Sequence, residues 1–204
     1  KDFSSYTYES IQERQQRVRQ LDSELKSCPF IELYEPSYEK IITPTFSTNY
    51  LNDKGEKVSL NIRYATPTFF KLYNIKVVEG EIPQIDKEDR RTVIVVNRAA
   101  MKALGYTSID GAGVIEENRK RADANVSLQP IVAVVEDYFE GHLASGVHPT
   151  IYPVGARFSG DLYQIAYTPG KKKEVLDFLR NLEYKIYGSE DFEYTILEDE
   201  VKAM

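Results

Sequence analysis

Two short runs of consecutive apolar residues, 93–96 and 131–135, give the clearest structural signal in the chain. Their β-branched and small residues suit strands that are covered on both faces, so we expect both runs near the centre of a sheet. Each run leads directly into a polar segment, which begins at Asn97 after the first run and at Glu136 after the second. Asn97 suits the N-cap of a helix that ends at Gly105.

Helical spacing marks both ends of the chain. Apolar residues recur among charged ones between residues 9 and 27, which predicts a mostly exposed helix with one narrow apolar stripe. A broader stripe follows residue 168, and Gly188 is placed to end that helix. Alternating residues on either side, at 162–167 and 192–196, predict strands. The last forty residues therefore predict a strand–helix–strand unit.

Alternation also predicts a β-hairpin in the first third of the chain. Its strands are residues 41–50 and 58–64, and its turn contains the sequence Asn-Asp-Lys-Gly at 52–55. Thr66 followed by Pro67 predicts the start of a short helix, because threonine caps helices and proline suits the first helical position. These elements together predict an α+β fold with mixed sheets and flanking helices.

Two further segments are predicted from their charge and proline content. The charged residues 116–125 predict a loop or hairpin tip. Residues 148–153 predict an extended edge segment, since it contains two prolines and proline cannot donate to a neighbouring strand.

Composition limits the classes of function. The 204 residues allow one large domain or two small ones, and 42% hydrophobic with 28% charged residues is typical of a folded protein. A formal net charge of -6 argues against nucleic-acid binding, which needs an excess of clustered basic residues. The single cysteine, Cys28, forms no internal disulfide. No apolar run approaches the roughly 20 residues that span a bilayer.

Candidate chemistry is sparse. Glu136, Asp137, His142 and His148 contain groups that bind zinc, but their spacing matches no recognised metal motif, and a polar loop after a buried strand is the simpler interpretation. No glycine-rich phosphate loop or nucleophile elbow is present in the sequence. Cys28 precedes a proline with no histidine nearby, which favours a structural thiol. The sequence thus predicts no catalytic, cofactor-binding or metal-binding residue.

Five segments in order carry a family resemblance. They are 65–80, 95–105, 110–112, 131–138 and 148–152. In this order the chain resembles the extracytoplasmic core domain of MacB-like permeases of ABC transporters, within the wider FtsX-type group. Arg98 stands where that family usually has an acidic residue, and Ala133 stands where glycine is common.

The resemblance implies a domain inserted between the first two transmembrane helices of a permease in the cell inner membrane, with this domain in the periplasm. It implies a two-lobed fold in which a distal lobe is inserted into a membrane-proximal lobe. The membrane-proximal lobe would comprise residues 1–63 and 161–204, and the distal lobe would comprise residues 64–160.

The resemblance also implies a role without chemistry. ATP would be bound and hydrolysed by a separate cytoplasmic ATPase domain or subunit. This domain would couple the resulting movement of its own transmembrane helices to export, efflux or contact with a periplasmic adaptor, and a second copy of the permease is a further expected partner. The candidate partner-contact residues are Tyr138, Phe139 and Tyr152.

Two alternatives remain open from the sequence. The first is a sensing module that binds a peptide or lipoprotein in a cleft between the lobes. The second is a metal-dependent hydrolase that uses Glu136, Asp137, His142 and His148.

Overall fold

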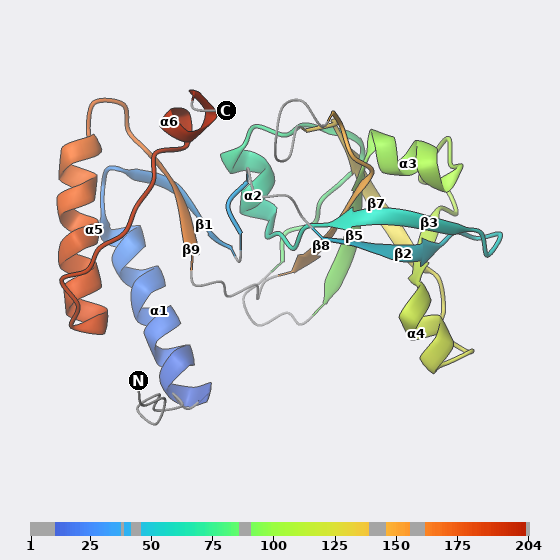
Figure 1. The fold of residues 1–204 in the computed structure, drawn as a ribbon, viewed down its shortest axis with the longest axis horizontal. Coiled ribbons are helices and arrows are strands. Elements are labelled where there is room, and N and C mark those ends of the chain that lie inside the picture. The colour runs from blue at the N-terminus through green and yellow to red at the C-terminus, as the bar shows by residue number, and fades with distance from the viewer. Residues whose placement is uncertain are drawn as a thin grey trace. The chain divides into compact units, whose positions relative to one another are not determined.

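The chain folds into two compact units, shown in a computed structural model (Figure 1). One comprises Lys1–Tyr34 and Ile165–Ile196, here called the terminal unit, and the other comprises Glu35–Gln164 and Leu197–Met204, here called the sheet unit. Helices and mixed sheets confirm the expected α+β class. The structure describes residues 11–37, 39–41, 46–85, 91–138, 146–155 and 162–202. No helix among them is both long enough and apolar enough to cross a membrane.

The terminal unit is built on two helices that lie side by side, α1 (Ile11–Ser27) and α5 (Lys172–Tyr187) (Figure 1). Both helices were predicted, and Gly188 ends α5 with a left-handed φ of 68°. Lys185 bonds Glu24 across the pair at 2.5 Å, and the Arg17 guanidinium lies 5.0 Å from the centre of the Tyr187 ring. Charged and aromatic contacts therefore supplement the apolar stripe of α5, whose Val175 and Leu182 are buried.

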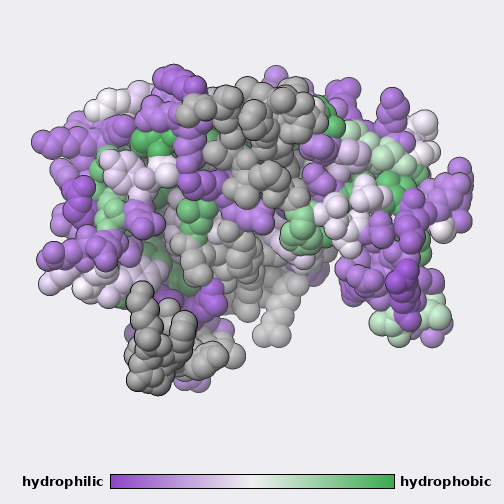
Figure 2. Space-filling model, in the orientation of Figure 1, coloured by the Kyte–Doolittle hydropathy of each residue, from purple (hydrophilic) through white to green (hydrophobic). Residues whose placement is uncertain are grey.

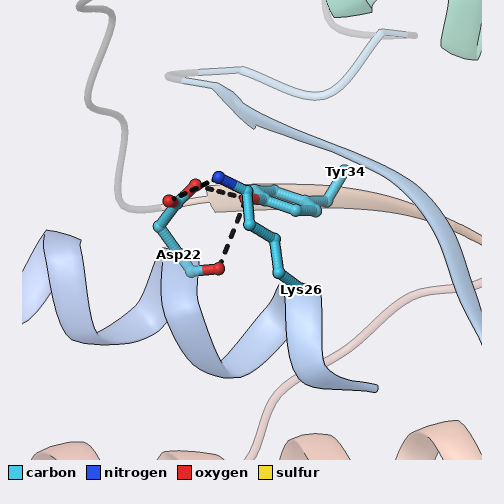
Figure 3. A network of polar contacts seen from close by, with 3 residues as sticks. All are labelled: Asp22, Lys26 and Tyr34. Carbon is cyan, nitrogen blue, oxygen red and sulfur yellow. Dashed lines mark hydrogen bonds and ion pairs between the residues drawn. The ribbon is translucent and has the colours of Figure 1, made fainter. Parts of the chain in front are cut away.

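Asp22 ties α1 to the middle of β1 (Ile31–Ser37) (Figure 3). The Tyr34 hydroxyl donates to the Asp22 carboxylate and to its backbone carbonyl, while the Lys26 ammonium donates to the other carboxylate oxygen at 3.0 Å. One carboxylate thus receives donors from the helix and from the strand, which fixes the path of the chain between them.

The predicted strand at residues 192–196 is absent. Residues 188–196 carry no helix or strand, and a short helix, α6 (Leu197–Lys202), follows them. The rings of Phe192 and Tyr194 stack with centres 5.5 Å apart, in a segment that pairs with no strand of the described residues. In the described residues β1 pairs only with β9 (Leu162–Tyr167), and the expected strand–helix–strand unit is wrong in its last element.

Seven strands make the sheet of the sheet unit, in the order β4-β7-β5-β8-β3-β2-β6. A further pairing of β6 with β7 closes most of the sheet into a ring. The strand bounds are β2 (Ser47–Leu51), β3 (Lys57–Ile62), β4 (Val77–Gly80), β5 (Thr92–Asn97), β6 (Gly113–Glu116), β7 (Gln129–Val135) and β8 (Thr150–Gly155). The predicted hairpin is confirmed as β2 and β3, which pair antiparallel. Its first strand begins at Ser47 instead of residue 41, and residues 42–45 lie outside the described residues.

Both faces of this sheet are covered. On one face, Ile94, Val96 and Val134 pack with residues of α3 (Arg98–Leu104), forming what we call the α3 core. On the other face, Val95 and Val135 pack with residues of α2 (Pro67–Leu72), forming the α2 core. The two apolar runs noted in the sequence are β5 and β7, and they are parallel neighbours. Their prediction as buried central strands is confirmed.

β8 differs from its prediction as an edge segment. It lies between β5 and β3, and all six of its residues are buried. The last β8 residue paired with β3 is Ile151, because β3 ends at Ile62. Pro153 pairs with Ile94 of β5, and its carbonyl accepts a hydrogen bond from the Ala65 N–H at 3.2 Å. Val154 then bridges Ala65, so pairing on the β3 side continues past a proline that lies in a central strand.

The charged segment 116–125 also differs from its prediction, since it contains a helix, α4 (Glu117–Ala122), with no buried residue. The ion pair of Arg121 with Glu117, 2.6 Å long and four residues apart, suits one helical turn. The surface drawn over α4 is largely hydrophilic (Figure 2).

The boundaries of the two units differ from those of the expected lobes. The expected membrane-proximal lobe was 1–63 with 161–204, and the expected distal lobe was 64–160. Strands β2 and β3 belong to the sheet unit, because they pair with β6 and β8. Helix α6 also belongs to the sheet unit. The position of either unit relative to a membrane stays a prediction.

Gly80 gives a test of this packing. Its φ is 72°, and a Cβ there would lie 2.2 Å from the Val132 carbonyl oxygen. We expect Gly80→Ala to lower the free energy of unfolding by about 3 kcal/mol, through left-handed strain plus the clash with β7. The matched control is Gly55→Ala, where φ is 75° and nothing lies within 4 Å; it should cost about 1 kcal/mol. Urea denaturation measures both, and equal costs would contradict the β4–β7 register.

Candidate functional site

The polar residues that follow β5 and β7 converge on the first turn of α3. Because the two strands are parallel, their carboxyl ends lie at the same edge of the sheet. The Ala100 N–H donates to Asn97 Oδ1 at 2.9 Å, and the Ala99 N–H donates to Asp137 Oδ1 at 2.9 Å. Two side chains from neighbouring strands therefore satisfy free N–H groups of one helix.

Asn97 also fastens β8. Its side chain is fully buried, and its Oδ1 accepts a second hydrogen bond from the Thr150 N–H at 2.9 Å. Its Nδ2 donates to the His148 carbonyl at 2.8 Å. Asn97 thus joins β5, α3 and the start of β8, and the polar atoms of its side chain are occupied by the fold.

The candidate metal residues that the structure describes, Glu136, Asp137 and His148, do not come together as a metal-binding group. Among the described residues no cluster of three or more His, Cys, Asp or Glu side chains suits a metal ion. Asp137 bonds the Ala99 N–H, and His148 contributes its backbone carbonyl to Asn97. His142 lies outside the described residues. Cys28 is buried, as expected of a structural thiol.

A buried carboxyl group, Glu35, lies at the start of the sheet unit. It is 1% exposed and accepts hydrogen bonds from the Thr66 N–H at 2.8 Å and the Thr66 hydroxyl at 2.5 Å. Thr66 in turn caps α2 by accepting from the Thr68 N–H at 3.1 Å, as predicted. Burial raises the pKa of Glu35 to about 7, although the two bonds from Thr66 act to lower it.

A second, partly buried contact lies at the other end of α2. The C-cap residue Tyr73 donates its hydroxyl to the side-chain carbonyl of Gln164. Its ring packs 5.1 Å from Phe69 and 5.9 Å from Tyr138, measured between ring centres. Burial raises the pKa of the Tyr73 hydroxyl, so Tyr73 stays a neutral donor.

Sequence reasoning found the Thr66 cap but missed Glu35 and Gln164. A signal for Glu35 was present, because residues 31, 33, 35 and 37 of a strand share one face, which places Glu35 beside Ile31 and Leu33. Nothing in the local sequence indicates Gln164, whose partner is 91 positions away.

The three candidate partner-contact residues have different surroundings. Tyr152 is 0% exposed, and its ring lies 5.4 Å from Phe70, so its side chain belongs to the α2 core and offers no surface to a partner. Tyr138 is half-buried beside Tyr73. Phe139 lies outside the described residues. A contact through Tyr138 stays a prediction.

A cavity of about 360 Å³ lies beside α2 and β4. Phe70, Ile75, Val77 and Ile82 give it an apolar lining, and Lys71 and Glu81 are exposed among its lining residues. This volume falls in the range of small-ligand sites. The cavity is therefore relevant to a binding function.

Of the comparisons with known proteins, only the comparison of structures finds similar proteins. No family model matches the sequence, and no curated protein matches it either. The fold is similar to that of the periplasmic region of MacB from Actinobacillus actinomycetemcomitans, with a TM-score of 0.57 and 15% identity over 96% of this chain and 87% of that chain.

Two further solved structures are similar. One is a domain of a protein described as a permease from Porphyromonas gingivalis, with a TM-score of 0.54 and 11% identity over 88% of this chain and 87% of that one. The other is the extracellular domain of the ABC-type transporter YknZ from Gram-positive bacteria, with a TM-score of 0.55 and 11% identity over 82% of each chain. The chain therefore has the MacB-like periplasmic fold that its sequence resembles.

The raised pKa of Glu35 predicts a pH-dependent stability. The folded protein holds the Glu35 proton up to about pH 7, whereas the unfolded chain releases it near the ordinary value of 4.5. The stabilising contribution is complete below pH 4.5, falls as the pH rises toward 7 and stays absent above it, a change of about 3 kcal/mol. Glu35→Gln removes the titration, so the variant should lack this part of the change.

Urea denaturation at pH 5 and pH 8 measures the effect as the difference between the wild-type chain and Glu35→Gln. An identical pH dependence in the two proteins would contradict the burial of an ionisable carboxyl at this position.

Proposed function

We propose that this chain, which has the fold of MacB-like periplasmic domains, is the extracytoplasmic domain of a bacterial ABC transporter permease. In this proposal it is anchored in the inner membrane through flanking transmembrane helices and lies in the periplasm. It couples helix movement driven by ATP hydrolysis to substrate export or to contact with an adaptor.

The observation that carries the proposal is the extent of the structural likeness. The similarity to the MacB periplasmic region covers 96% of this chain and 87% of that one, so it includes both units and the connections between them. A likeness limited to the sheet would be weaker support, because one sheet architecture serves many functions.

The hydrogen bonds of the buried polar residues support a non-enzymatic role. Asn97, Asp137 and Thr66 are hydrogen-bonded to backbone N–H groups of helices, and Glu35 is bonded to Thr66. A catalytic acid or base has to reach a substrate proton, and these groups are directed to the protein's own backbone. ATP binding in the proposed transporter belongs to a separate cytoplasmic ATPase.

The domain's contribution is then mechanical. Rigid-body movement is one of the established forms of conformational switching, and the closed, doubly covered sheet is suited to move as one body. A periplasmic adaptor and a second copy of the permease are the proposed partners.

Ligand sensing is a second candidate function, favoured by the 360 Å³ cavity beside α2. Its lining is apolar over most of its area, as in small-molecule sites, and Lys71, Asn74, Glu81 and Gln84 contribute polar groups. Peptide binding by this cavity would be compatible with the transporter role.

The location and the movement are testable with one cysteine variant of the full-length protein that contains this chain. Tyr184 is 60% exposed on α5, and the native Cys28 is 5% exposed, which gives a low background. In right-side-out membrane vesicles, Tyr184→Cys should react with a membrane-impermeant maleimide without lysis. Its labelling rate, or its crosslinking to a second copy, should change at least twofold when ATP is supplied on the cytoplasmic side.

The parent full-length protein, with cysteines outside this chain replaced by serine so that only Cys28 is left, is the matched control and should label only after denaturation. Labelling of Tyr184→Cys that requires lysis would contradict the extracytoplasmic location. Equal rates and equal crosslinking with and without ATP would contradict the coupling.

A further inference from the structure

Strand β4 is an edge of the sheet with apolar side chains exposed to water. It pairs with β7, and no second strand of the described residues pairs with it. Val77 is 41% exposed and Val78 is 37% exposed. The one charged residue of β4, Glu79, is turned to the protein, because its Oε1 accepts from the Ser108 hydroxyl and the Ile109 N–H. Charged residues usually protect open edges from further strands, so β4 lacks a common form of protection.

The register of β4 indicates which of its backbone groups are available. The Lys76 carbonyl accepts from the Glu136 N–H at 2.9 Å, and the Glu81 N–H donates to the Val132 carbonyl at 3.2 Å. The backbone groups of Lys76 and Glu81 therefore face β7. Residues of an antiparallel pair alternate between facing the partner and facing away from it. Val77, which follows Lys76, thus directs its N–H and carbonyl to the open edge.

The edge alone offers only a short stretch for pairing. β4 has four residues, and its register with β7 shifts between Val77 and Glu79, as in a β-bulge. A partner strand could therefore pair over a few residues only, and such short pairing is marginally stable in water. A partner at this edge needs a second attachment close to the strand.

The cavity of about 360 Å³ supplies this attachment, because it lies directly beside β4. Val77 and Gly80 of β4 line it, and Ile75 and Ile82 add apolar surface. The remaining wall includes residues spaced three or four apart along one face of α2 and the turn after it, namely Pro67, Phe70, Lys71 and Asn74. The volume is sufficient for one large apolar side chain.

Charges at the two ends of β4 favour one direction of an added strand. Lys76 precedes β4, Glu81 follows it, and both are exposed. A strand antiparallel to β4 would pass Glu81 first and Lys76 last. Opposite charges on neighbouring strands attract each other. The best-suited strand therefore has a basic residue before its apolar side chain and an acidic residue after it.

We propose that the β4 edge and its cavity bind an extended peptide segment as an added antiparallel strand. One large apolar side chain of the peptide fills the cavity, with a basic residue before it and an acidic residue after it. Strand addition beside a side-chain pocket is a recurrent mode of peptide recognition. The proposal deepens the ligand-sensing candidate and rests on that function for its purpose, whereas the binding itself is a property of the chain.

A peptide titration of the 204-residue chain, followed by the NMR signals of its backbone amides, tests the site. The probe is the blocked peptide acetyl-Lys-Thr-Phe-Thr-Asp-amide, in which threonine and phenylalanine favour an extended backbone. It should shift the signals of Val77, Gly80 and the other lining residues, with a dissociation constant below about 1 mM. The charge-reversed peptide acetyl-Asp-Thr-Phe-Thr-Lys-amide has the same composition and should bind roughly threefold more weakly.

Two methylated peptides test whether the backbone of the probe pairs with β4. One has a methyl group on the amide nitrogen of its phenylalanine, and the other has it on that of the following threonine. Because alternate N–H groups of a strand face its neighbour, one of the two methyl groups should weaken binding roughly tenfold and the other should have a much smaller effect.

A matched pair of variants tests the cavity. Val77 and Val78 are neighbouring, exposed residues of β4, but only Val77 lines the cavity. Val77→Trp should fill the cavity and weaken binding of the probe roughly tenfold, whereas Val78→Trp should leave it within about twofold of the parent chain. Thermal unfolding of both variants checks that the sheet is intact.

Three results would overturn the proposal. One is the absence of signal shifts at a peptide concentration of about 5 mM. Another is binding at the cavity that neither methyl group weakens, which would indicate a site for small apolar molecules and would leave ligand sensing standing. The third is equal weakening by Val77→Trp and Val78→Trp. None of them bears on the transporter role, which maleimide labelling of the full-length protein decides.

Discussion

Burial of the central strands on both faces is the constraint on which the rest of the structure depends. β5 and β7 lie between the α3 core and the α2 core, so they have no wet face on which to place polar side chains. Polar groups are therefore confined to the strand ends, where each one must find a partner. Asn97 meets this requirement by bonding the backbone of α3 and of β8, and Asp137 meets it at the same helix. Helix position and strand order are thereby fixed at one point.

The same constraint explains why these polar residues stabilise the fold. Asn97, Thr66 and Glu35 have their side-chain oxygens occupied by backbone or hydroxyl donors of the protein itself. What the arrangement does offer is rigidity. A sheet that closes through β6 and β7 and is covered on both sides deforms little. These properties suit the proposed role of a body that transmits movement.

Local sequence patterns predicted most helices and strands. Features that depend on contacts between distant residues were not predicted. Predictions that depend only on neighbouring residues are confirmed. They are the apolar runs of β5 and β7, the caps at Thr66 and Asn97, and the glycine at the end of α5. The alternation of Phe192 and Tyr194 predicted a strand, but residues 188–196 form neither helix nor strand. The prolines of residues 148–153 suggested an edge because the strands on either side of β8 are distant from it in the sequence. The bond of Tyr73 to Gln164 joins residues 91 positions apart, so no local pattern reveals it. Resemblance indicated the fold, but the hairpin of β2 and β3 was assigned to the other unit because its pairing with β6 and β8 is long-range.

Native-state hydrogen exchange of the 204-residue chain tests most directly whether the sheet unit is one rigid body held at Asn97. The amides of β5 and β7, together with the Ala100 and Thr150 amides that bond Asn97, should open with one free energy, equal to that of global unfolding. Opening of Ala100 or Thr150 at a free energy about 2 kcal/mol or more below that of the central strands would contradict the account, since α3 or β8 would then move independently of the sheet.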